Sequence, residues 1–394
     1  MSTRLDVEAV VSTLRRCLPD TDAIGLHEPE FAGREWAYVK ECLDTGWVSS
    51  AGEFVSQFER RLAEYTGAER AVAVVNGTAA LHVALQLVGV EEGDEVLVPA
   101  LTFVATANAV SYCGAVPHFV DSEARTLGLD PEKLALYLDD IVEDRAGTPH
   151  NRKTGRPLRA VVAMHTFGHP VDLDPLREVA DRYELAVVED AAEALGSRYK
   201  GEHVGTEGAL ATISFNGNKT ITTGGGGALL TDDAELADRA RHLTTTAKVD
   251  HRRDYYHDRV GYNYRLPNLN AALGCAQLEQ LPSFLERKRR LAKHYAGAFR
   301  SVQGVEVVEE PSFAQSNYWL NALRLDADCA AHRADIVDQA NEAGISTRPA
   351  WTLMPHLPMY EHCPRMDLSV AERLEERLLN LPSSASLVSS FDHA

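Results

Sequence analysis

Residues 213–228 read ISFNGNKTITTGGGGA, which places Lys219 between an apolar run and a tract of four glycines. The run from Ala209 to Phe215 predicts a β-strand, and a second strand is expected from Ala228 to Thr231. Glycines let the backbone approach a ligand closely. A lysine amine, with an ordinary pKa of about 10.4, is a nucleophile only after it loses its proton or forms an imine. Lys219 is therefore a candidate Schiff-base lysine, and the alternative is an exposed charge on a glycine-rich hairpin.

Strands and helices alternate along the sequence on both sides of this stretch. The strand segments are almost continuously apolar, which is typical of strands buried on both faces of a sheet. Strand, helix, strand repetition at this spacing predicts an α/β domain with a mostly parallel, doubly wound sheet. The expected strands span residues 71–75, 95–98, 116–120, 159–165, 185–189, 209–215 and 228–231, and the expected helices span 79–88, 102–113, 130–142, 173–183 and 233–243.

The remaining parts of the chain, including both ends, do not follow this alternation. A long helix at 271–299, kinked or interrupted at Pro282, is expected to lead out of the large domain into a small α+β domain. Residues 143–158 are expected to form a polar loop. The remaining expected elements are helices at 5–17, 32–44, 331–343 and 370–379, a helix that ends at Gly67, strands near 304–308 and 318–325, and a turn at 344–351. The predicted division is an N-terminal segment at 1–30, a large domain at 31–280 and a small C-terminal domain at 281–394.

Composition limits the classes of function. With 39 Lys and Arg against 58 Asp and Glu, the formal net charge is −19, which disfavours binding to nucleic acid or to an anionic membrane. The six cysteines form no CxxC pair and no cluster with zinc spacing, so we expect reduced thiols and no metal site. We also expect no signal peptide and no membrane span, and hence a cytoplasmic protein.

Candidate ligand-binding groups follow several of the predicted strands, and ligands of such sheets bind at the carboxyl ends of the strands. Gly77 and Thr78 begin a helix, where backbone N–H groups suit a phosphate; an ordinary helix cap is the alternative. Phe103 could stack on a flat ring or simply lie in the core. Asp190 ends an apolar strand, so it either caps a helix or pairs with a cationic ligand nitrogen.

Lys219, with Ser214 and Asn216 beside it, completes the set. A phosphate-binding turn, a stacking ring, an aspartate for a ring nitrogen and a lysine for an aldehyde are the four needs of pyridoxal 5′-phosphate (PLP). Each signal is weak alone, but their placement on successive strand ends predicts a PLP site.

Eight segments resemble the DegT/DnrJ/StrS family of fold-type I, PLP-dependent sugar aminotransferases, and within it the LegC/PglE-like branch. The resemblance covers roughly residues 25–360 and implies a large PLP-binding domain with a small C-terminal domain. The segments are LHEPEF (26–31), CLDTGWVSSAG (42–52), NGTAALH (76–82), PALTFVATANA (99–109), HTFGHPVDL (165–173), VEDAAEALGS (188–197), SFNGNKTITTGGGG (214–227) and GYNYRLPNLNAALG (261–274).

The resemblance implies a role for each matching residue. Lys219 would bind PLP as an imine, Asp190 would pair with its ring nitrogen, and Phe103 would stack on the ring. Glu193, where relatives often have His or Gln, would lie near a PLP oxygen or the sugar. Gly77, Thr78 and Ser214 would bind the phosphate beside Asn216, and Asn263 would reach the phosphate of a second subunit in a homodimer with shared sites. Some dehydratase relatives have histidine in place of the lysine, so Lys219 favours transamination.

The implied reaction moves the amino group of L-glutamate onto the C4 keto group of a nucleotide-linked 4-keto-6-deoxy sugar. The branch suggests a UDP-linked 2-acetamido-2,6-dideoxy-4-keto-hexose, a precursor of bacillosamine or legionaminic acid; GDP- or dTDP-linked sugars and C3 amination are alternatives. Arg348, Arg265 and Lys248 are the candidate cations for the diphosphate. Two other classes remain open: a non-enzymatic PLP-binding regulator on the same scaffold, and a Rossmann oxidoreductase, which is disfavoured because no GxGxxG turn follows the first strand.

Overall fold

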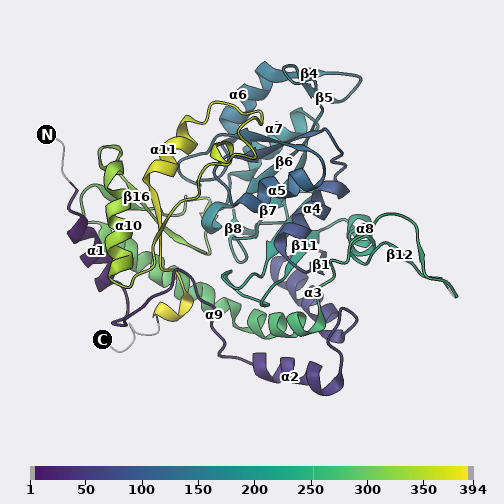
Figure 1. Ribbon diagram of the computed structural model, residues 1–394, viewed down its shortest axis with the longest axis horizontal. Coiled ribbons are helices and arrows are strands. Elements are labelled where there is room, and N and C mark those ends of the chain that lie inside the picture. The colour runs from purple at the N-terminus through teal and green to yellow at the C-terminus, as the bar shows by residue number, and fades with distance from the viewer. Residues whose placement is uncertain (1–4, 252, 389–394) are drawn as a thin grey trace.

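A seven-stranded sheet forms the centre of the computed structural model, which describes residues 5–251 and 253–388 (Figure 1). The strand order is β1-β11-β10-β7-β6-β2-β3, and all neighbours from β10 to β3 are parallel. Only β11 is antiparallel to its neighbours β1 and β10. The predicted mostly parallel α/β sheet is confirmed. The strands are β1 (Arg70–Val74), β2 (Glu95–Pro99), β3 (Val116–Val120), β6 (Leu158–Met164), β7 (Ala186–Asp190), β10 (Leu210–Ser214) and β11 (Gly227–Thr231).

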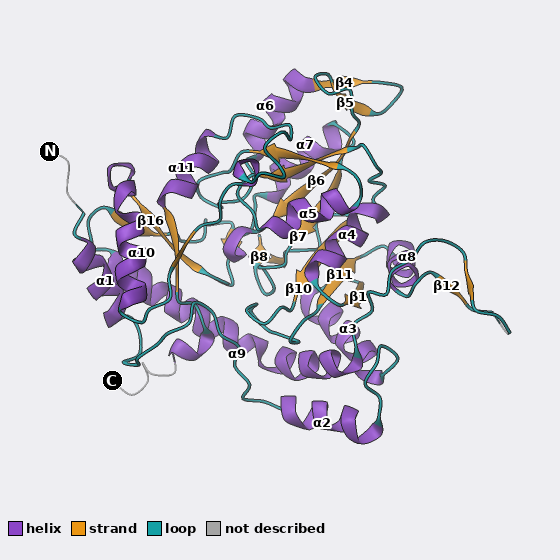
Figure 2. Ribbon diagram, viewed as in Figure 1, coloured by secondary structure: helices purple, strands orange, loops and turns teal. Residues whose placement is uncertain are grey.

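Helices cover both faces of this sheet because successive side chains of a strand point to opposite faces. In β1, Val72 and Val74 belong to the core under α4, α5 and α8, whereas Ala71 and Ala73 belong to the core under α3, α6, α7 and the first half of α9. Figure 2 shows the strands running through the middle of the molecule with helices around them. The helices of this part are α2 (Glu35–Thr45), α3 (Glu53–Thr66), α4 (Gly77–Leu87), α5 (Val104–Tyr112), α6 (Pro131–Ile141), α7 (Leu173–Arg182), α8 (Ala234–Thr244) and α9 (Asn268–Phe299).

Helix α9 joins the large sheet to a second, smaller core. Its residues Leu281 and Phe284 pack on the large sheet, whereas Leu291, Tyr295 and Phe299 pack on a four-stranded antiparallel sheet of order β14-β16-β18-β17. Helix α1 packs in that same second core, so the N-terminal helix lies against the C-terminal part of the chain (Figure 1). The elements are α1 (Val7–Arg16), β14 (Val305–Val307), β16 (Asn321–Leu325), α10 (Arg333–Glu342), β17 (Arg348–Pro349), α11 (Ser369–Arg377) and β18 (Leu378–Leu381).

The domain boundaries at residues 30 and 280 stay a prediction. Residues 1–4 of the predicted N-terminal segment and 389–394 of the predicted C-terminal domain lie outside the described residues. Among the helices of the described ranges, none has both the length and the apolar character needed to cross a bilayer.

Three local expectations were wrong. Helix α9 is not interrupted at Pro282: the proline costs the helix one backbone hydrogen bond, and the buried side chains of Leu281 and Phe284 on either side hold it against the large core. The expected polar loop at 143–158 contains a short hairpin of β4 (Val142–Asp144) and β5 (Pro149–Asn151). The helix expected at 370–379 ends at Arg377, because the next residues pair with β16 as strand β18.

Candidate active site

The carboxyl ends of the parallel strands bring eight of the predicted site residues around one cavity of about 200 Å³. Asp190 is the last residue of β7 and Ser214 the last of β10, while Gly77 begins the helix that follows β1. Phe103 lies just before α5, with 49% of its surface exposed, so its ring is free to meet a ligand. The eight residues are Gly77, Thr78, Phe103, Asp190, Glu193, Ser214, Asn216 and Lys219.

Asp190 is buried and is held by two neutral donors. Its Oδ2 accepts a hydrogen bond from Thr106 Oγ1 at 2.8 Å, and its Oδ1 accepts one from the backbone N–H of Ala192 at 3.2 Å. Neither donor compensates a full negative charge in a buried place. The carboxylate at the cavity wall therefore suits a protonated ring nitrogen such as that of PLP, which would supply the missing positive charge.

The start of α4 suits a small anion. Asn76 caps the helix by accepting a hydrogen bond from Ala79 N–H at 2.7 Å, and Gly77 and Thr78 of its first turn, whose N–H groups have no partner within a helix, line the cavity. A Cβ atom added at Gly77 would lie 2.9 Å from Cβ of Ser214, so a side chain there would enter the space beside the Ser214 hydroxyl. Gly77, Thr78 and Ser214 thus fit the phosphate of PLP.

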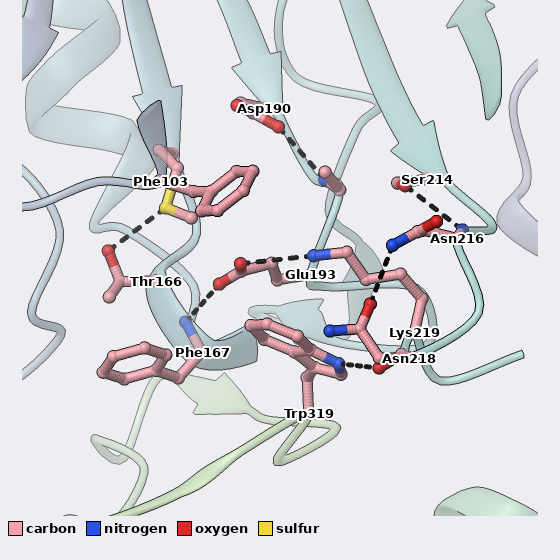
Figure 3. Close-up of polar contacts among 12 residues, drawn as sticks. Phe103, Thr166, Phe167, Asp190, Glu193, Ser214, Asn216, Asn218, Lys219 and Trp319 are labelled. Atoms are coloured by element: carbon pink, nitrogen blue, oxygen red, sulfur yellow. Dashed lines mark hydrogen bonds and ion pairs between the residues drawn. The ribbon is translucent and has the colours of Figure 1, made fainter. Parts of the chain in front are cut away.

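The Lys219 amine lies between a carboxylate and an aromatic ring (Figure 3). Its Nζ is 3.2 Å from Glu193 Oε1 and 3.8 Å from the centre of the Trp319 ring. The other oxygen of Glu193 accepts a hydrogen bond from the N–H of Phe167 at 2.9 Å, and Phe167 adopts a φ of +55° that non-glycine residues rarely take. The backbone at Phe167 therefore fixes the carboxylate and leaves one oxygen for the lysine.

Burial raises the pKa of the Glu193 carboxyl to about 7. The nearby Lys219 and the Phe167 N–H lower this pKa, and the charge of Asp190 raises it, but desolvation is the largest effect. A carboxyl group that titrates near neutral pH can hold or release a proton beside the lysine during a reaction.

A second cavity of about 490 Å³ adjoins the first and shares Phe103, Glu193, Asn216 and Lys219 with it. Its other lining residues come from distant parts of the chain and include His27, Trp319, Arg348 and Trp351. Arg348 is exposed on β17, so its guanidinium is available to an anionic substrate. Of the three cations predicted to bind a diphosphate, Arg348 is the one that lines this cavity.

The other two predicted cations lie elsewhere. The buried Arg265 donates through Nη1 to Glu59 Oε1 at 2.7 Å and to the carbonyl oxygen of Ala73 at 2.9 Å. This side chain ties α3 to β1 and lines neither cavity, so its placement does not support the predicted contact with substrate. Lys248 lies exposed on β12 (Lys248–Val249), with its Nζ 4.6 Å from the Tyr255 ring centre, on a hairpin that extends away from the body in Figure 1.

Asn263 is exposed on the loop before α9 and lines neither cavity of its own chain. Its predicted contact with the phosphate of a second subunit stays a prediction.

Sequence reasoning missed several residues that the structure places at the site. Thr106 supports Asp190, while His27, Trp319 and Trp351 line the second cavity. His27 and Trp319 stand inside segments without a recognisable turn or strand-end signal, and only the folding of the chain ends onto the large sheet brings them to Lys219. The available signal was the family resemblance, because His27 lies within LHEPEF and Thr106 within PALTFVATANA.

Comparison with known proteins agrees with this geometry. A family model described as the DegT/DnrJ/EryC1/StrS aminotransferase family matches residues 29–390. The chain is 40% identical over 364 residues to the GDP-perosamine synthase of Escherichia coli O157:H7, which covers 92% of this chain and 94% of that protein. The GDP-perosamine synthase of Caulobacter vibrioides is 39% identical over 94% of this chain and 95% of its own length.

A solved structure, the aminotransferase TlmJ from Streptoalloteichus hindustanus, superposes with a TM-score of 0.84 at 30% identity, covering 93% of this chain and 95% of that one. Aminotransferases of this family use PLP, the cofactor that the lysine, aspartate and phosphate-binding turn fit. The match over most of the chain confirms the family expected from the sequence: the protein belongs to the DegT/DnrJ/EryC1/StrS family and is a PLP-dependent sugar aminotransferase.

Proposed function

We propose that the protein transfers the amino group of L-glutamate to the C4 keto group of a nucleotide-linked 4-keto-6-deoxy sugar. The observation that carries this proposal is the second cavity, which opens onto Lys219 and Glu193 and includes Arg348. With a volume of about 490 Å³ it offers more room than the cofactor cavity of about 200 Å³, as a sugar nucleotide requires.

The proposed roles of the residues follow from their positions. PLP, when bound, supplies an aldehyde carbon that carries the amino group from donor to acceptor and a ring that accepts an electron pair. Asp190 keeps a proton on the ring nitrogen, and the N–H groups at Gly77 and Thr78 hold the phosphate with the Ser214 hydroxyl. Phe103 covers one face of the ring, and Asn216 lies beside the lysine.

Lys219 is the proposed catalytic base: it would remove a proton from the α carbon of the amino donor in the first half-reaction and deliver one to the sugar carbon that receives the amino group in the second. Glu193 would hold the Lys219 amine at 3.2 Å and exchange a proton with it, because a carboxyl group with a pKa of about 7 is present in both its protonated and its ionised form near neutral pH. Arg348 would bind the glutamate carboxylate or the substrate diphosphate, since these two anions enter the same cavity in turn.

For the sugar nucleotide we propose the UDP-linked 2-acetamido-2,6-dideoxy-4-keto-hexose, because segments 214–227 and 261–274 resemble the LegC/PglE-like branch. A GDP-linked 4-keto-6-deoxy sugar is the second candidate, and the names of the two GDP-perosamine synthases favour it. With either nucleotide, the aminated sugar would be a building block for a surface glycan.

The deciding experiment compares kcat/KM for the UDP and GDP forms of the same 4-keto sugar, with and without the acetamido group, with glutamate as donor. Mass and NMR analysis of the products identifies the aminated carbon. A preference for GDP, or indifference to the acetamido group, would overturn the UDP assignment and leave the reaction class. If glutamate converts the bound cofactor but no nucleotide sugar accepts the amino group, the proposed acceptor class is wrong.

A further inference from the structure

Lys288 lies in α9 as one of the most deeply buried side chains, with 1% of its surface exposed. Its Nζ lies 2.9 Å from Nε2 of His27, and it donates to the carbonyl oxygen of Trp319 at 3.2 Å and to that of Ser383. No carboxylate is among these contacts. A buried lysine amine without an acidic partner is costly, because its charged form loses hydration without a compensating charge.

The three contacts fasten together three segments that are far apart in the chain. Lys288 and His27 are 261 residues apart, and Lys288 and Ser383 are 95 apart. The segments also bond to one another: Ser383 N–H donates to the carbonyl oxygen of Leu26 at 2.7 Å, and the hydroxyl oxygen of Ser383 accepts from the N–H of Asn321 at 2.8 Å. The lysine amine therefore stands at the centre of a junction between the two chain ends and residues 319–321.

Two members of this junction, His27 and Trp319, line the second cavity next to Lys219. Trp319 is fixed at both ends: its carbonyl oxygen bonds Lys288, and its indole Nε1 donates to the carbonyl oxygen of Asn218 at 2.7 Å. Its ring then lies over the Lys219 amine (Figure 3). Lys288 itself lines neither this cavity nor the cofactor cavity, so any effect of its amine on the site would pass through His27 and Trp319.

Either protonation form of the amine satisfies all three contacts. An ammonium group donates three hydrogen bonds, whereas a neutral amine donates to the two carbonyl oxygens and accepts one from His27 Nε2–H. Burial lowers the pKa of Lys288 well below its ordinary value, and it lowers that of His27 together with the charges of Lys288 and Lys219. In both forms the contact holds the imidazole ring in one orientation.

We propose that Lys288 is a positioning residue for the sugar substrate: by holding the ring of His27 and the backbone of Trp319, it shapes the wall of the second cavity. This inference rests on the proposed function, because the larger acceptor would contact more of that wall than glutamate does. Methionine at this position would match the aliphatic stem of lysine and remove the amine, so Lys288→Met isolates the contribution of the three contacts.

The experiment compares Lys288→Met with wild type and with Lys293→Met, which removes an exposed amine from the same helix. For Lys288→Met we expect the KM for the keto-sugar nucleotide to rise about tenfold or more, while PLP affinity and the rate of the glutamate half-reaction change less than about twofold. Lys293→Met should match wild type. An unchanged sugar KM, or an equal loss of PLP affinity, would overturn the proposal.

A second variant and a spectroscopic signal keep the test decisive. His27→Phe leaves Lys288 in place. Like Lys288→Met, it should raise the KM for the keto-sugar nucleotide while PLP affinity changes less than about twofold. In protein labelled with ¹⁵N-histidine, the ring signal that His27→Phe removes should shift in Lys288→Met, and an unshifted signal would show that Lys288 does not hold His27. If wild type completes the glutamate half-reaction but aminates no nucleotide sugar, the proposed function fails, and this ring signal alone still decides whether Lys288 positions the side chain.

Discussion

Lys219 is the single side chain on which the proposed chemistry depends most directly. Replacing it with alanine or arginine should abolish turnover and the visible absorbance of lysine-bound PLP, because alanine has no amine and arginine does not lose its proton. The fold should survive, which circular dichroism would check. Transamination that persists in either variant would remove Lys219 from its proposed role.

Asp190 should matter through its charge rather than its shape. Asp190→Asn keeps an acceptor for Thr106 Oγ1 but loses the negative charge that would hold a proton on the ring nitrogen. We expect weaker PLP binding and a decrease in kcat of several orders of magnitude, measured by cofactor titration and steady-state kinetics. A nearly wild-type kcat would reduce Asp190 to a helix cap.

Glu193 should make the stability of the cofactor-free protein depend on pH. Its pKa is raised from 4.5 to about 7 by burial, so the folded state binds the proton more tightly than the unfolded state does. The resulting stabilisation is complete below pH 4.5 and is lost as the pH rises through 7. Relative to Glu193→Gln, wild type should lose on the order of 3 kcal/mol of unfolding free energy between pH 4.5 and 8. Urea unfolding of both proteins at several pH values measures this; parallel curves would contradict the assignment.

At the scale of elements, the ion pair between Arg265 and Glu59 joins helix α3 to strand β1. Glu59 also accepts from Ala73 N–H at 2.8 Å and pairs with the half-exposed Arg241 at 3.0 Å, so removal of Arg265 takes away the buried one of its two cations. Arg265→Met should lower the unfolding free energy by about 1–3 kcal/mol, because the carboxylate keeps its pair with Arg241. Because the side chain lines neither cavity, the KM for the sugar should stay within about twofold of wild type. A large rise in KM without loss of stability would restore the role in substrate binding predicted from sequence.

At the scale of the whole molecule, the expected unit is a homodimer with shared sites. Asn263 is exposed and lines neither the cofactor cavity nor the second cavity of its own chain, which is compatible with a role in the site of a neighbouring subunit. Mixing an Asn263→Ala chain with a Lys219→Ala chain should restore activity, because one site of each heterodimer then has both residues. The measurement is activity of a purified heterodimer carrying two different tags. A heterodimer without recovered activity would argue that Asn263 acts within its own chain, and an active Asn263→Ala homodimer would show that it has no role.

The sequence by itself determined the family, the mostly parallel sheet and the order of chemical groups along its strand ends. These are local signals: an apolar run, a cap residue or a glycine tract is written within a few neighbouring positions. Gly77, Asp190, Ser214 and Lys219 could be predicted together because the carboxyl ends of parallel strands must meet at one edge of a sheet.

Only the tertiary structure decided which distant side chains meet. His27 and Lys288 are separated by 261 residues, and Arg265 and Glu59 by 206, so no local pattern records either contact. The same holds for β18: its first two residues, Leu378 and Leu379, were expected to end a helix but pair with β16 in the fold. Burial then set the chemistry: the composition of the chain cannot show that Glu193 titrates near 7 or that Lys288 lies without an acid, because desolvation depends on what packs around each group.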